Sequence, residues 1–98
     1  MIDGTYTMQI DTPMGTKTGT AVVRTEGSKA YADIDAPIIG KQKAVGTVDG
    51  DSFSAEGSFK IMFVGKVDYR MRGEVVGDDL HMVIDSSKGT FEIRGVRA

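Results

Sequence analysis

The longest regular pattern in the chain runs from residue 65 to residue 77, GKVDYRMRGEVVG, where apolar and polar residues alternate without a break. Val67, Tyr69 and Met71 fall on one face of this segment, and charged residues fall on the other. Side chains of a β-strand point alternately to the two faces of a sheet, so a period of two predicts a half-buried strand. The remaining segments can be compared with this one.

Seven further segments predict strands, because each alternates apolar and polar residues between turn-forming glycine, proline, aspartate or serine. The predicted strands are 5–11, 17–26, 29–35, 41–49, 52–61, 65–77, 80–85 and 90–97. The 98 residues include 13 glycines and only two prolines, and no long stretch has the 3.6-residue period of a helix. We therefore predict an all-β fold and a single domain over residues 1–98.

The predicted strands follow one another through short turns, which predicts an antiparallel meander. Eight such strands most simply close into an up-and-down barrel, because closure removes the exposed edges of the sheet. An internal repeat supports this interpretation. Ile10-Asp11 precedes Gly15-Thr16 in the first of four similar hairpins, and Ile84-Asp85 precedes Gly89-Thr90 in the last.

Inward positions of the segments 17–26, 29–35 and 41–49 carry small residues, whereas those of the later strands carry large ones. An eight-stranded barrel is about wide enough to be filled by side chains or to hold one small ligand. The leading hypothesis is a void that binds a small hydrophobic ligand; the alternative is a dry, packed core. The candidate ligand-binding residues are Tyr6, Met8, Ala21, Ala32, Ala44, Phe59, Tyr69 and Met71.

Alternate loops of a meander lie at the same end, and here they form a predicted rim that is apolar and basic. Its candidate residues are Met14, Ile38, Ile39, Phe63, Lys41 and Lys66. The rim could admit a ligand, and its lysines would favour an anionic head group. It could instead be the contact of a homodimer or of another protein, such as an enzyme to which this chain is an accessory.

Charge and composition exclude several classes of function. The net charge is -2 with both signs mixed, which lacks the clustered basic excess of nucleic-acid binders. The absence of cysteine excludes disulfides, thiolate catalysis and cysteine-ligated metals. No apolar run is long enough to cross a bilayer, and the first ten residues lack the features of a signal peptide. We expect a soluble, cytoplasmic protein without a transmembrane segment.

No catalytic or metal site is predicted. His81 is the single histidine, and the alternation of its strand places it on the outward face (outward parity). It has no second histidine or cysteine beside it, so we expect a solvated surface residue. Aspartates 11, 35 and 85 precede three of the loops and could suggest a calcium ring, but aspartate there more often bonds the turn backbone. A less favoured hypothesis is an isomerase or cyclase in which Tyr6 or Tyr69 acts as the acid. General acid catalysis needs a group with a suitably shifted pKa near the substrate, and none is evident in the sequence. No cofactor is expected.

The start and the end of the chain resemble those of a known family. Gly4-Thr5-Tyr6 is similar to the Gly-x-Trp opening of calycins, the lipocalin, fatty-acid-binding and avidin-like barrels, with tyrosine in place of tryptophan. In that family a basic residue near the end of the last strand packs over the aromatic ring, and Arg97 is the matching residue here. The resemblance implies a closed barrel, most like the small bacterial lipocalin-like proteins.

Overall fold

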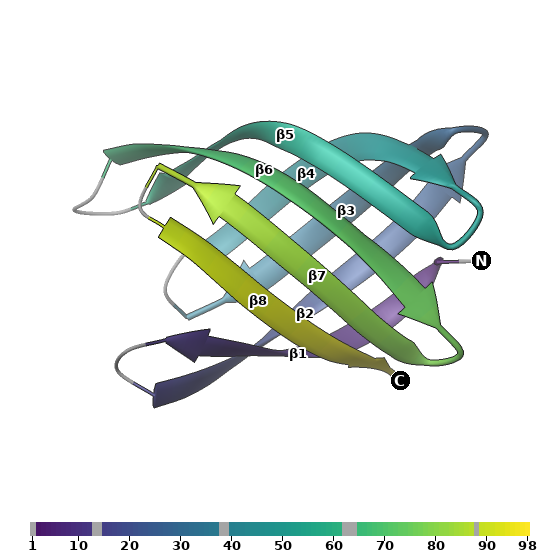
Figure 1. Ribbon diagram of the computed structural model, residues 1–98, viewed down its shortest axis with the longest axis horizontal. Helices are drawn as coiled ribbons and strands as arrows, with labels where there is room; N and C mark the ends of the chain where they lie inside the picture. Colours follow the sequence, from purple (N-terminus) through teal and green to yellow (C-terminus); the bar gives the residue numbers. More distant parts are fainter. Residues whose placement is uncertain (1, 13–14, 38–39, 62–64, 88) are drawn as a thin grey trace.

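The computed structural model describes residues 2–12, 15–37, 40–61, 65–87 and 89–98, which form strands and turns and no helix (Figure 1). The strands are β1 (Gly4–Thr12), β2 (Gly15–Glu26), β3 (Lys29–Ala36), β4 (Gly40–Asp49), β5 (Ser52–Ile61), β6 (Gly65–Val76), β7 (Asp79–Ser86) and β8 (Gly89–Arg97). The predicted all-β class is confirmed. Predicted and observed strand ends differ by at most two residues; β6, for example, ends before Gly77, whose φ of 62° belongs to a turn.

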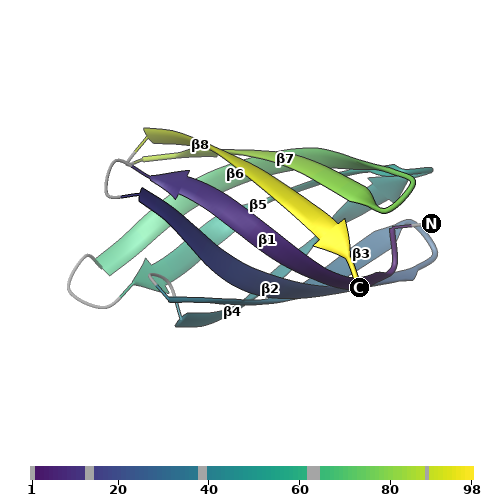
Figure 2. The same ribbon diagram turned by 90° about the horizontal axis from the view of Figure 1, so that it is seen from below.

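The strands form one closed barrel in chain order, with every neighbouring pair antiparallel. Figure 2 shows β1 lying beside β8, and this pairing closes the barrel from Tyr6↔Arg97 to Ile10↔Ile93. Both termini lie at one end, which we call the floor, and the β1–β2, β3–β4, β5–β6 and β7–β8 connections lie at the other, the mouth (Figure 1). The predicted up-and-down meander is therefore confirmed.

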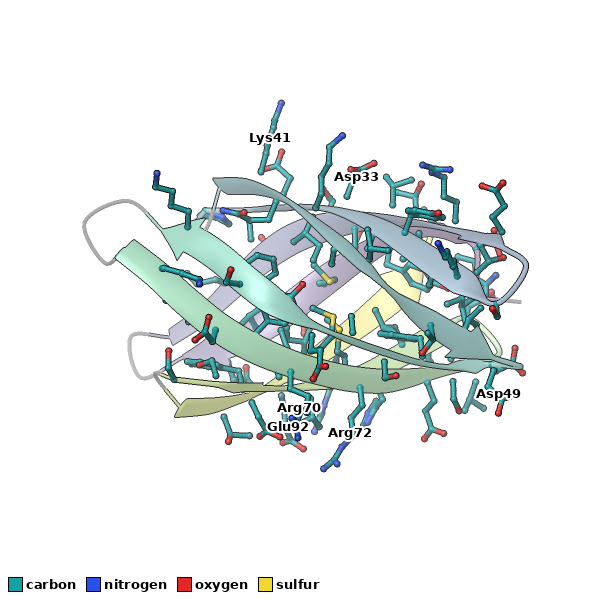
Figure 3. All side chains as sticks on the ribbon, turned by 90° about the horizontal axis from the view of Figure 1, so that it is seen from above. Asp33, Lys41, Asp49, Arg70, Arg72 and Glu92 are labelled. Atoms are coloured by element: carbon teal, nitrogen blue, oxygen red, sulfur yellow. The ribbon has the colours of Figure 1, made fainter. Side chains whose placement is uncertain are left out.

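One ladder of the barrel is much shorter than its neighbours. β4 and β5 pair over four rungs, from Asp49↔Ser52 to Gly46↔Ala55, whereas β5 and β6 pair over ten. Figure 3 shows the two ribbons meeting near Asp49 and running apart in the half of the barrel that carries Lys41. We call this stretch, residues 43–45 of β4 and 56–60 of β5, the β4–β5 seam.

Tyr6 and Arg97 close the floor of the barrel. Tyr6 is fully buried, and its hydroxyl donates a 2.6 Å hydrogen bond to the carbonyl oxygen of Ile2. The guanidinium carbon of Arg97 lies 5.5 Å from the centre of the Tyr6 ring, within the range of a cation–π interaction. The same side chain donates hydrogen bonds to the carbonyl oxygens of Asp3 and Gly77. The predicted packing of Arg97 over Tyr6 is thus observed.

Asp3 ties the N-terminal segment to β2, and this contact makes stability depend on pH. Its carboxylate accepts hydrogen bonds from the hydroxyl (2.7 Å) and the backbone N–H (2.8 Å) of Thr25, and these bonds lower the pKa of Asp3. A carboxyl whose pKa is lower in the folded state stabilises the fold above its unfolded pKa of about 4 and loses this effect as pH falls through the folded value. The melting temperature should therefore fall more steeply below about pH 4 in wild type than in Thr25→Val.

Thr20→Val is the matched control for this prediction, because Thr20 is an exposed threonine on the same strand. Thermal unfolding of the three proteins between pH 6 and pH 2.5 measures the effect. Parallel pH profiles for wild type and Thr25→Val would show that the Asp3–Thr25 contact does not contribute.

Candidate functional site

The barrel interior contains an apolar cavity of about 40 Å³ beside the wall of small side chains. Five of the predicted ligand-binding residues line it: Met8, Ala21, Ala32, Ala44 and Met71. Its accessible lining is entirely apolar, because β2, β3 and β4 contribute mostly alanine, valine and glycine there. The cavity therefore lies where the small inward residues predict it.

The large side chains opposite this wall limit the cavity. Met8 and Met71 are buried, and Met82, Leu80 and Phe53 complete the far side. About 10 to 15 Å³ on this measure holds one water molecule, so the volume admits roughly three water-sized groups. Methionine is unbranched and adapts its shape to its surroundings, so three methionines make this side of the cavity deformable.

Three of the predicted ligand-binding residues lie outside the lining of the cavity. Tyr6 belongs to the floor, where Ile2 and Arg97 contact it. Phe59 and Tyr69 stack on each other closer to the mouth, with ring centres 4.2 Å apart and an interplanar angle of 13°. Burial raises the pKa of both tyrosine hydroxyls, and for Tyr6 the charge of Arg97 opposes part of this effect.

Several lining residues are absent from the predicted set, among them Gly46, Phe53, Ala55 and Met82. Their inward parity was the available signal, but parity gives the face of a strand and not the level along the barrel axis. Gly46 and Ala55 also form the last rung of the β4–β5 ladder. The cavity thus extends to the point where pairing between these strands ends.

The predicted rim falls largely on residues that the structure does not describe. Met14, Ile38, Ile39 and Phe63 lie outside the described residues. Lys41 and Lys66 are described, and both are exposed on the outer face, Lys41 opposite Asp35 and Lys66 opposite Lys60. These two lysines therefore do not line the cavity.

His81 lies on the outer face of β7 and is exposed, as predicted. It borders two open hollows of about 300 and 620 Å³ that follow the outer surface of β6, β7, β8 and β1. Glu74 and Arg94 flank His81 in the neighbouring strands, so residues of both charge signs line the hollows.

Two of the three recurrent aspartates, Asp11 and Asp85, accept hydrogen bonds from side chains of the following strand, and part of each of their turns lies outside the described residues. Thr16 donates its hydroxyl to Asp11 at 3.1 Å, and Thr90 donates to Asp85 at 2.9 Å, so threonine after the loop glycine completes the motif. Within the described ranges, no group of three or more His, Cys, Asp or Glu side chains could hold a metal ion.

Comparisons with known proteins show the fold alone. No protein-family model matches the chain, and no curated protein matches it. A solved structure of a redesigned β-barrel is similar, with a TM-score of 0.67 over 99% of this chain and 90% of that one, at 11% sequence identity. In the described part of this chain, no helix is long and apolar enough to span a membrane.

Proposed function

We propose that this protein is a lipocalin-like barrel that binds a small hydrophobic molecule in the cavity beside Ala21, Ala32 and Ala44. The observation that carries the proposal is the cavity itself, because small apolar pockets in protein cores stay dry and can bind apolar guests. The sequence Gly4-Thr5-Tyr6 at the start of β1, over which Arg97 packs, supports the lipocalin-like part of the proposal. A ligand of only a few non-hydrogen atoms fits directly, and a larger one requires Met8, Met71 or Met82 to change rotamer.

Xenon is a suitable probe, because it is apolar, monatomic and known to enter small dry cavities. With the methionine methyl groups labelled with ¹³C, xenon should shift the signals of Met8, Met71 and Met82, which line the cavity. Ala44→Val places two more carbon atoms in the cavity and should weaken xenon binding at least about tenfold, without a large loss of stability.

Val45→Leu is the matched control, because it enlarges the next side chain of β4, which is 55% exposed on the outer face. It should leave the xenon response unchanged. The absence of any shift in the three methyl signals at saturating xenon pressure would show that the core is fully packed and would overturn the proposal.

A further inference from the structure

The β4–β5 seam exposes two strand edges in an otherwise closed barrel. Beyond the rung Gly46↔Ala55, residues 43–45 pair only with β3 and residues 56–60 pair only with β6, within the ranges that the structure describes. The side chain of Gln42 spans the gap and donates a 3.0 Å hydrogen bond to the carbonyl oxygen of Lys60. An amide N–H from a side chain thus occupies a position that the N–H of a neighbouring strand would take. An edge of this kind is a template for an added strand.

At Gly57 no side chain covers the β5 side of the seam. Gly57 has the inward parity of Ala55 and Phe59, yet it is exposed. A Cβ atom at Gly57 would lie 3.3 Å from the Tyr69 hydroxyl oxygen, so this hydroxyl is directed at the seam. Tyr69 as a whole is only 7% exposed, its hydroxyl forms no hydrogen bond with a described residue, and the hydroxyl oxygen itself is not closed off from solvent. A hydroxyl that water can reach here can also be reached by a group from outside the chain.

The charged side chains along the seam are mainly lysines. Lys43 and Lys60 point outward from its two edges, and Lys66 lies directly opposite Lys60 in the β5–β6 ladder, a like-charge pair that is destabilising on its own. Glu56, the carboxylate on the β5 edge, is held by Arg70 at 3.4 Å. Lys43 lies 4.0 Å from Asp33 and Lys66 lies 3.9 Å from Asp68, and the side chains of both pairs are largely exposed. Exposed ion pairs of this kind contribute little, so the carboxylates of an acidic segment can compete for these lysines.

We propose that the β4–β5 seam docks an extended acidic peptide, which adds as a strand along residues 56–60 of β5. Alternate side chains of a strand point to opposite faces, so apolar residues of the peptide would reach the Phe59–Tyr69 stack while acidic ones face Lys43 and Lys60. The Tyr69 hydroxyl would bond to the peptide backbone beside Gly57. A second copy of this chain is a poorer occupant, because pairing two such edges brings their lysines together. The site is separate from the cavity and does not depend on the proposed ligand.

A short capped peptide of alternating valine and glutamate is the probe for this site. When it is added to the full chain, amide hydrogen exchange should slow at Glu56, Ser58 and Lys60, whose backbone groups face the seam, while exchange in the β1–β2 ladder stays unchanged. The same peptide with a methyl group on every backbone nitrogen cannot donate the required hydrogen bonds and should not protect these amides. A valine–lysine peptide should bind at least about tenfold more weakly at low ionic strength.

Two variants separate the parts of the proposal. Lys60→Glu should weaken the valine–glutamate peptide about fivefold, whereas Lys29→Glu, the same charge change at the floor end of β3, should have little effect. Tyr69→Phe removes only the hydroxyl and should weaken the peptide while leaving xenon binding intact, because Tyr69 does not line the cavity. Unchanged exchange at residues 56–60 at saturating peptide, equal binding of the lysine peptide, or a protein that dimerises through the seam would each overturn the proposal.

Discussion

Replacing Gly46 by alanine should lower the free energy of unfolding by about 3 kcal/mol or more, because a Cβ atom has no space at this position. Such an atom would overlap the carbonyl oxygen of Ser54, and it would lie 2.7 Å from the Cβ of Ala55. These neighbours are backbone or directly attached to it, so they cannot rotate away. Gly46 and Ala55 form the last rung before the seam, so moving either strand would shorten a ladder of only four rungs.

Gly57→Ala is the matched control for Gly46→Ala, because both glycines have inward parity on adjacent strands. At Gly57 the added Cβ would meet the end of the Tyr69 side chain at 3.3 Å and no backbone atom among its three nearest neighbours, so the cost should stay within about 1 kcal/mol. Denaturant unfolding followed by circular dichroism measures both variants. For a domain of this size, a loss of 3 kcal/mol lowers the melting temperature by roughly 12 °C or more. Equal stability of the two variants would contradict the steric explanation.

The strands and their order could be predicted from the sequence, because burial on one face imposes a period of two. In β6 the buried residues Val67, Tyr69, Met71 and Val75 alternate with exposed ones as the pattern predicts. Glycines with positive φ at positions 15, 40, 65 and 89 follow the mouth loops, which explains the repeat of the four hairpins. The turn chemistry and the strand pattern therefore agree, and each supports the other.

The candidate site could be predicted only in part, because parity alone does not determine volume or pairing. The contrast between Ala21, Ala32 and Ala44 and the larger residues opposite them gives the position of the cavity, but its volume depends on methionine rotamers. The alternation of apolar and polar residues does not predict the seam, since segments 41–49 and 52–61 alternate like the other strands. Where pairing ends depends on how the strands diverge beyond Gly46, which is a property of the closed barrel as a whole.

Replacing Arg97 should also lower stability strongly, because its guanidinium holds together three parts of the floor. It bonds to the N-terminal segment through the Asp3 carbonyl (2.9 Å), to the β6–β7 turn through the Gly77 carbonyl (2.9 Å), and it covers Tyr6 on β1. The Arg97 side chain is 24% exposed, so these contacts are partly shielded from water. Its ion pair with Asp78, a side chain that is 77% exposed, should add little.

Arg97→Met keeps much of the apolar stem and removes the guanidinium, so it should lower the free energy of unfolding by about 2 kcal/mol through two lost charge-assisted hydrogen bonds and the lost ring contact. Arg97→Lys retains the charge but cannot reach both carbonyls with a planar fork, so it should fall between wild type and Arg97→Met. Arg94→Met on the outer face of β8 is the matched control and should change stability by at most about 0.5 kcal/mol. Amide exchange adds a local measurement, because loss of the Arg97 contacts should first release the Ile2–Tyr6 end of the chain. If Arg97→Met is as stable as Arg94→Met, the floor is closed by apolar packing of Ile2 and Tyr6 rather than by the guanidinium.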